Sequence, residues 1–211
     1  IAEKIAEDYF VPIRKTVDLN QPDWDGEKVV MIPEIKIAYD AVAEAGLICP
    51  DQSYEMGGMQ LPLVVTSCAM GYITAAASTT NGFHALTAAN ANLLETHASQ
   101  EQIETWVPRL RTGEFAGTMA LSEPQAGSSL ADMRTKAVAQ DDGTYRIFGN
   151  KIWISGGDHE LSSNIVHAVL ARIEGAPPGV KGISMFICPK FLLNEDGSVG
   201  ARNDVQLAGL F

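Results

Sequence analysis

The hydrophobic pattern of this chain changes its period near Phe115, and no other feature constrains the fold as strongly. Before that point, apolar residues recur at helical spacing between boundary signals typical of helices. Pro33 suits the first position of a helix that Gly46 would end, and Pro62 can open a longer one. A capping-box pattern at Ser99 begins a further helix, which we expect to end at Gly113.

Beyond Phe115 the apolar residues alternate or gather in short β-branched runs. Residues 136–140 alternate, and an Asp-Asp-Gly turn at 141–143 then leads into a second alternating run, which predicts a hairpin. Residues 164–173 and 182–188 are β-branched runs separated by a Gly- and Pro-containing loop. We therefore expect at least five strands in this half.

Together the two patterns predict an α+β chain with two domains. Residues 1–114 should form an all-α helical domain. Residues 115–211 should form a small antiparallel β-barrel or sandwich.

The segment from Leu61 to Ala77 is the longest apolar-rich run. It is interrupted by Thr66, Ser67, Gly71 and Thr74, and it is shorter than the roughly 20 apolar residues that a membrane span needs. We therefore expect a helix buried on most sides and no membrane span.

The charge balance limits the possible partners. The chain has 15 Lys and Arg residues against 26 Asp and Glu residues, which gives a net charge of -11 at pH 7. This charge would repel a nucleic-acid backbone. A phosphate-bearing ligand would need local backbone N–H groups or a few well-placed cations.

The cysteines and histidines show no metal-ligand spacing, so no metal site is expected. Cys49, Cys68 and Cys188 are far apart and odd in number, which excludes a fully paired disulfide framework. No basic segment followed by an apolar stretch begins the sequence, so no secretory signal is visible. A reducing compartment such as the cytoplasm is the expected location.

Residues 115–132 are the segment in which chemistry is most strongly indicated. An apolar strand leads into S-E-P-Q-A-G-S-S, where Pro124 fixes φ, Gly127 permits unusual backbone angles and Ser128 and Ser129 add hydroxyl groups. Such a loop can present N–H groups and hydroxyls to an anion. From composition alone, an ordinary Ser/Gly/Pro loop between strands is the favoured interpretation, because turns are rich in these residues.

Residues 151–157 form a second candidate segment. On a strand, Trp153 and Ser155 would lie on the same face, so that one could stack while the other donates a hydrogen bond. The alternative is a half-buried strand aromatic followed by the start of a turn.

Taken together, these two segments resemble the flavin-binding signature of the acyl-CoA dehydrogenase family. The sequence M-A-L-S-E-P-Q-A-G-S-S-L, followed by G-N-K-I-W-I-S-G-G, matches the family's (T/S)-E-P-x-x-G-S loop and G-x-K-x-W-I-(T/S) segment. The similarity extends to residues 44–58, 99–115 and 181–186, in the family's order. It covers nearly the whole chain and implies the family's N-terminal helical and middle β domains.

The resemblance implies FAD as cofactor and assigns roles to individual residues. Ser122 would offer its hydroxyl to the pyrimidine end of the isoalloxazine, and Gly127 and Ser128 would meet the pyrophosphate. Ser128 would also contact the acyl-CoA substrate. Trp153 would shield the flavin, and Ser155 would donate a hydrogen bond near N5. The complete set of implied cofactor-binding residues is Met119, Leu121, Ser122, Gly127, Ser128, Trp153, Ile154 and Ser155.

The implied activity is α,β-dehydrogenation of an acyl-CoA thioester in fatty-acid metabolism. The family's base is a Glu in a C-terminal helical domain that these residues do not include, so no catalytic residue is assigned and the chain alone should be inactive. Glu123 is expected to fix the loop. The resemblance further implies an electron-transfer flavoprotein as acceptor and a homodimer or homotetramer. An acyl-CoA oxidase, another flavoprotein oxidase or monooxygenase, and a non-catalytic fragment or assembly module are the alternatives.

Departures from the family pattern affect the substrate more than the cofactor. Met119 stands where many members have an aromatic residue, Gln125 where Gly is usual and Ser129 where Asp often follows. Residues 156–160, 194–197 and 202–204 resemble the branch that contains the 3-methylmercaptopropionyl-CoA dehydrogenases.

Overall fold

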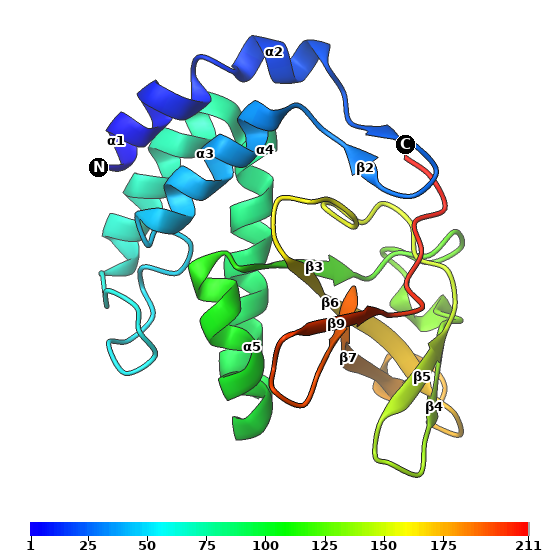
Figure 1. Ribbon diagram of the computed structural model, residues 1–211. Coiled ribbons are helices and arrows are strands. Elements are labelled where there is room, and N and C mark those ends of the chain that lie inside the picture. Colours follow the sequence, from blue (N-terminus) through cyan, green and yellow to red (C-terminus); the bar gives the residue numbers. More distant parts are fainter. Residues whose placement is uncertain (211) are drawn as a thin grey trace.

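The computed structural model describes residues 1–210, with helices gathered on one side of the molecule and strands on the other (Figure 1). The helices are α1 (Ala2–Ile5), the π-helical turn η1 (Ala6–Phe10), α2 (Arg14–Leu19), α3 (Pro33–Glu44), α4 (Leu63–His97) and α5 (Gln100–Thr112). The 3₁₀ turns are η2 (Leu130–Asp132) and η3 (Val180–Gly182). The strands are β1 (Asp23–Trp24), β2 (Val29–Val30), β3 (Phe115–Ala120), β4 (Lys136–Ala139), β5 (Tyr145–Phe148), β6 (Asn164–Ile173), β7 (Ile183–Pro189), β8 (Phe191–Leu193) and β9 (Val199–Arg202).

The sequence signals for the helix ends are confirmed. Pro33 is the first residue of α3, and Pro62 immediately precedes α4. The Ser99 side chain accepts a hydrogen bond from the backbone of Gln102, whose side chain accepts one from Ser99, so that α5 begins with a full capping box. Gly113 ends α5 in the left-handed conformation that favours glycine.

Gly113 is also the packed junction between the helices and the sheet. A Cβ atom at this position would lie 2.9 Å from both the Ala43 Cβ and the Ile48 Cδ1. The Tyr39 hydroxyl donates a hydrogen bond of 3.2 Å to the Gly113 carbonyl. Two residues later β3 begins, and Phe115 is part of the same buried core as Phe10, Leu94 and Leu110 of the helices, which therefore extends from the helices into the sheet.

The second half forms a five-stranded sheet in which β6 is central. Strand β6 pairs with β3 and β4 in parallel and with β7 in antiparallel orientation, while β4 and β5 form the predicted hairpin. The helical domain and the β domain are confirmed, but the expectation of purely antiparallel pairing is wrong. The long connection from β3 to β6 passes through the β4–β5 hairpin, and a connection of that length allows parallel neighbours. Two smaller sheets, β1–β2 and β8–β9, lie outside it.

The C-terminal half of α4 is joined to the sheet by buried hydrogen bonds. The Asn90 side-chain amide donates to the carbonyls of Thr118 at 3.1 Å and Val166 at 2.8 Å. The Gly117 N–H donates to the Thr87 hydroxyl at 3.0 Å. A side chain at Gly117 would collide with Asn90, since a Cβ there would lie 2.6 Å from the Asn90 Cβ. Helix and sheet therefore meet closely at this glycine.

The N-terminal half of α4 is largely exposed, so the expectation that this helix is buried on most sides is wrong for the described residues. Leu63 and Val64 are 70% and 69% exposed, because α1, η1 and α3 contact α4 and leave this face uncovered. By length and composition α4 could cross a bilayer, a criterion that core helices of soluble proteins also meet, and 28% of its most apolar window is buried.

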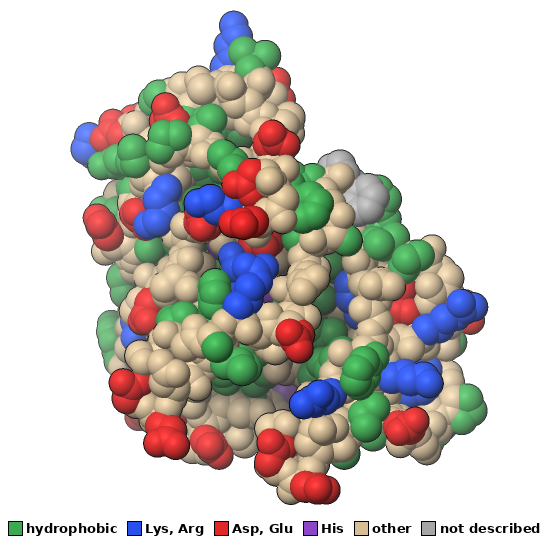
Figure 2. Space-filling model, turned by 45° about the vertical axis from the view of Figure 1, so that its right-hand side comes forward, with side chains coloured by type: hydrophobic (Ala, Val, Ile, Leu, Met, Phe, Trp, Pro, Cys, Tyr) green, Lys and Arg blue, Asp and Glu red, His purple; other side chains and the backbone are tan. Residues whose placement is uncertain are grey.

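On the face shown in Figure 2, acidic and basic side chains are interspersed with polar and apolar ones. Basic and acidic side chains lie next to one another on this face. Exposed ion pairs of the molecule include Lys28–Glu160 and Lys36–Asp40. This arrangement suits a surface whose net charge is negative.

Candidate functional site

The loop after β3 is a tight turn that exposes the residues expected to meet an anion. The Glu123 N–H donates to the Ala126 carbonyl at 2.6 Å, and the Ala126 N–H donates to the Glu123 carbonyl at 3.1 Å. Pro124 and Gln125 are exposed at the tip, and Ser128 follows on the surface. The loop is therefore fixed by its own backbone.

The Glu123 carboxylate holds this loop from inside. It is buried and accepts hydrogen bonds from the Thr135 hydroxyl at 2.5 Å, the Thr135 and Arg134 N–H groups, the Gln125 amide and the Lys151 ammonium at 2.9 Å. Burial alone would raise the pKa of Glu123, but these donors outweigh it and lower the pKa to about 2. Glu123 is therefore ionised and fully engaged at neutral pH, which confirms its expected role as a loop-fixing residue rather than a base.

The two signature segments lie side by side. The Ile152 N–H donates to the Ser122 carbonyl at 2.9 Å, and the Lys151 ammonium donates to the Leu121 carbonyl at 3.1 Å as well as to Glu123. The structure thus joins residues 121–123 to residues 151–152, which are almost 30 positions apart in the sequence.

Residues 151–157 do not form the expected strand. Trp153 has a φ of +59°, which is left-handed and strained for a bulky residue, and it breaks the alternation of side chains. The Gly157 N–H then donates to the Ile154 carbonyl at 3.1 Å and closes a turn. The expectation that Trp153 and Ser155 share a strand face is therefore wrong, although both side chains are exposed at the surface.

The predicted site residues form an open surface beside this junction. Trp153 is 65% exposed and Met119 is 36% exposed, which is unusual for large apolar side chains in a folded domain. Ser128 and Ser155 are exposed as well, while the remaining members, Leu121, Ser122, Gly127 and Ile154, are half-buried.

The glycine at position 127 is explained better by a bound ligand than by packing against neighbouring residues. A Cβ at Gly127 would contact only the Ser122 hydroxyl, at an ordinary 3.8 Å, and the φ of Gly127 is not positive. No neighbour in residues 1–210 thus requires a glycine there. Open space at Gly127, next to exposed hydroxyls and an exposed indole, fits the pyrophosphate and ring system of FAD.

Other groups lie away from this surface. A groove bordered by Lys36, Asp40, Glu114 and Ser162 shares no residue with the predicted site. Within residues 1–210, no three His, Cys, Asp or Glu side chains are grouped so that they could hold a metal ion.

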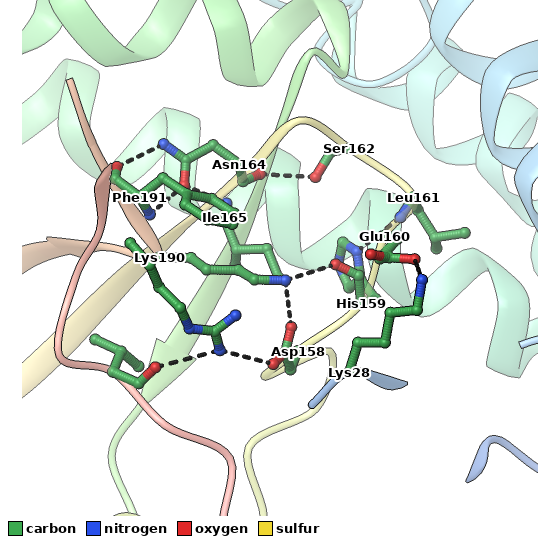
Figure 3. A network of polar contacts seen from close by, with 12 residues as sticks. Lys28, Asp158, His159, Glu160, Leu161, Ser162, Asn164, Ile165, Lys190 and Phe191 are labelled. Carbon is green, nitrogen blue, oxygen red and sulfur yellow. Dashed lines mark hydrogen bonds and ion pairs between the residues drawn. The ribbon is translucent and has the colours of Figure 1, made fainter. Parts of the chain in front are cut away.

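Sequence reasoning missed two features of the site. Thr135 completes the shell around Glu123, although nothing in the sequence marks it as a partner. Asp158 forms a buried ion pair with Lys190, 32 positions away, and Figure 3 shows this pair at the centre of a polar network. The one sequence signal was Lys190, a charged residue within the apolar run 187–193.

Comparisons with known proteins agree with the fold and the joined segments. The family model "Acyl-CoA dehydrogenase, N-terminal domain" matches residues 4–114, and "Acyl-CoA dehydrogenase, middle domain" matches residues 118–205. The helical and β halves therefore correspond to the N-terminal and middle domains of this family. The chain belongs to the acyl-CoA dehydrogenase family.

Two curated bacterial relatives are equally similar. The 3-methylmercaptopropionyl-CoA dehydrogenase of Ruegeria pomeroyi is 39% identical over 95% of this chain and 34% of its own length. A butyryl-CoA dehydrogenase of Syntrophomonas wolfei is 39% identical over 98% of this chain and 34% of its own length. The chain thus spans about a third of the length of these relatives.

A solved structure extends the comparison to the cofactor. The acyl-CoA dehydrogenase of Bacillus anthracis complexed with FAD has a TM-score of 0.70 at 23% identity, covering 90% of this chain and 29% of that one. This likeness shows the fold. FAD is the cofactor of the family, as the sequence resemblance implied.

Proposed function

We propose that these residues form the flavin-cradling part of an FAD-dependent acyl-CoA dehydrogenase, with the domain boundary between Glu114 and Phe115. The observation that supports this proposal is the contact between the loop fixed by Glu123 and the Trp153 segment. This contact lies beside the open space at Gly127. When bound, FAD supplies the redox chemistry and accepts the hydride.

The family resemblance supports a proposed role for each of these residues. Met119, Leu121 and Ile154 pack against the flavin or contact it through the backbone. Ser122 donates to the pyrimidine end of the ring, and Ser155 donates near N5. Three further residues complete the proposed set, in which Gly127 and Ser128 hold the pyrophosphate, Ser128 also touches the acyl-CoA, and Trp153 covers the ring from solvent.

The complete enzyme needs more chain than these residues. We propose that the catalytic base is a Glu in a C-terminal helical domain and that this domain covers the apolar face of α4 around Leu63 and Val64. Without the base, the 211 residues alone should show no turnover. The proposed assembly is a cytoplasmic homodimer or homotetramer that passes electrons to an electron-transfer flavoprotein.

The substrate is proposed as an acyl-CoA with a short acyl chain, in the branch of the 3-methylmercaptopropionyl-CoA dehydrogenases. Residues 156–160, 194–197 and 202–204 support this branch. The equal identity to a butyryl-CoA dehydrogenase makes butyryl-CoA the competing substrate, so both thioesters belong in one assay.

The proposal is tested by a substitution at Gly127 that should weaken ligand binding without changing stability. Gly127→Val should leave the thermal midpoint unchanged, because a Cβ atom there would contact only the Ser122 hydroxyl, at 3.8 Å. FAD affinity of the full-length protein should fall by about 10-fold or more, because the side chain fills the cradle. Gly71→Ala, at an open position of α4, is the matched control and should bind FAD as the wild type does.

Activity is measured as anaerobic dye reduction by the FAD-loaded full-length protein with each thioester. Turnover with one of them, together with reduced flavin that persists in air, supports the dehydrogenase. Prompt peroxide formation would identify an oxidase instead. Equal FAD affinity of the wild type and Gly127→Val would remove the proposed cradle.

A further inference from the structure

The segment that carries Trp153 and Ser155 is bracketed by two buried ion pairs. Before it, Lys151 pairs with Glu123 at 2.9 Å, with side chains 11% and 3% exposed. After it, Asp158 pairs with Lys190 at 2.5 Å, with side chains 4% and 7% exposed. The first pair belongs to the family's signature, whereas the second is not used by any role assigned so far.

Asp158 connects this segment to two distant parts of the β domain. Its second carboxylate oxygen lies 3.3 Å from the Arg202 guanidinium, at the end of β9. Lys190, between β7 and β8, also donates to the His159 carbonyl at 3.2 Å (Figure 3). One carboxylate thus ties the end of the segment to the strands β7, β8 and β9.

The backbone between the two pairs needs such an anchor. Trp153 and Gly156 both have left-handed φ values, +59° and +62°. Glycine adopts this conformation readily, but a tryptophan does so only when the surrounding structure over-determines it. Phe83 of α4 limits the segment from one side, since a Cβ at Gly156 would lie 3.3 Å from its ring.

Stability alone does not explain a buried ion pair at this point. Desolvation of two charges offsets most of their attraction, and apolar residues of similar volume would stabilise the fold as well or better. What a hydrogen-bonded pair adds is a defined geometry for the groups it joins.

We propose that Asp158 is a positioning residue for flavin binding, which acts with Lys190 to hold the Trp153–Ser155 segment in the conformation that receives the isoalloxazine. This inference rests on the proposed function, because it concerns the same flavin site. Asp158 touches neither the cofactor nor the substrate in this scheme. It acts through the backbone of the six residues 153–158, the last of which is Asp158 itself.

The first test is made on the protein without flavin. In Asp158→Asn, amide hydrogen exchange at residues 152–157 should become about 10-fold faster, because the opening free energy of this local unit falls. Exchange in β3 and β6 should not change. Glu160→Gln is the matched control, since Glu160 forms an exposed pair with Lys28 two residues further along. Unchanged exchange at residues 152–157 in Asp158→Asn would overturn the positioning role.

The second test measures flavin binding by the full-length protein at a temperature at which every variant is folded. Affinity for FAD should fall by about 10-fold in Asp158→Asn, the size commonly seen when an outer-shell partner of a binding site is removed. The visible circular dichroism of the bound flavin should change as well. A purely structural role would lower the thermal midpoint and leave both readouts at the wild-type value, which would refute the proposal.

A double variant without either buried charge keeps the test valid if Asp158→Asn alone misfolds. Asp158→Asn with Lys190→Met removes both buried charges, so it avoids the unpaired lysine of the single variant. It should fold and still bind FAD weakly, and wild-type affinity in this variant would overturn the proposal. A wild-type protein that takes up no FAD would instead refute the proposed function, and the exchange experiment would still decide whether Asp158 holds the segment.

Discussion

The two halves of α4 have surroundings opposite to those that their compositions predict. The N-terminal half is apolar, yet Leu63, Val64 and Val65 are exposed, while the C-terminal half buries Thr87 and Asn90. A break at Ala77, whose φ of -158° and ψ of 89° are not helical, separates the two halves. The composition of a helix face therefore indicates whether it needs an apolar or a polar partner. The fold decides whether such a partner lies against it.

In the buried polar half, the sheet supplies hydrogen-bond partners to the Thr87 hydroxyl and to the NH₂ group of the Asn90 amide. Thr87 and Asn90 face β3 at Gly117, where the missing side chain lets helix and strand approach closely. The apolar half has no such neighbour among residues 1–210. The following experiments, in order of expected effect, probe this contrast.

Asn90→Leu should destabilise the chain most. It removes two buried hydrogen bonds to the Thr118 and Val166 carbonyls, which should lower the free energy of unfolding by about 3 kcal/mol. Urea unfolding provides the measurement. Asn92→Leu, at an exposed position of the same helix, is the control and should differ little from the wild type. Equal stabilities of the two variants would show that the buried amide does not join helix and sheet.

Acidification should weaken the buried half through His84. Burial lowers the pKa of His84 from 6.5 to about 4, so the folded chain keeps it neutral while the unfolded chain binds a proton below pH 6.5. The stabilisation is complete above pH 6.5 and is lost toward pH 4, by about 2 kcal/mol between pH 7 and 5.

The histidine contribution is isolated by comparing unfolding at pH 7 and pH 5. His159 and His167 have pKa values lowered to about 4 by burial as well, so His84→Phe should remove about one third of the combined histidine effect. An unchanged pH dependence in His84→Phe would mean that His84 is protonated in the folded chain.

Thr87→Val should have a smaller effect of about 1 kcal/mol on the free energy of unfolding, since it removes one neutral hydrogen-bond partner of the Gly117 N–H. The change keeps the shape of the side chain. Thr79→Val, at an exposed position of α4, serves as the matched control. If both variants unfold at the same denaturant concentration, the Thr87 contact contributes nothing measurable.

Leu63→Ser should change the unfolding free energy of this chain by less than about 0.5 kcal/mol, because the side chain is 70% exposed. In the full-length protein the same change should cost more than about 2 kcal/mol if a further domain covers this face. Thermal unfolding of both forms makes the comparison. A small effect in the full-length protein would contradict the proposal that a further domain covers this face of α4.

Local signals predicted the element ends well. The capping box at Ser99, the αL glycine at 113, the proline before α4 and the 164–173 strand all depend on interactions within a few residues. Such interactions can be read from a sequence because the partners are neighbours. The parallel pairing of β3 with β6 could not, since it depends on how a connection of more than 40 residues is routed.

The sequence indicated two segments that the structure brings together, but not the geometry in which they meet. The motifs identified both segments that meet at Ser122 and Ile152, and Glu123 has the expected structural role. Period-2 spacing suggested a strand through Trp153, but a left-handed φ at this residue overrides it. Asp158 and Lys190 were invisible because a long-range ion pair leaves no periodic trace.

The packed junction at Gly113 has a consequence for ligand binding. Tyr39, Ala43 and Ile48 enclose it, so the connection between the helices and the sheet has no free space in which to bend. The surface that bears Met119 is therefore set in its orientation to the helices before any ligand arrives. Binding across the two halves then involves no loss of hinge entropy, and affinity depends on the local order of the loops alone.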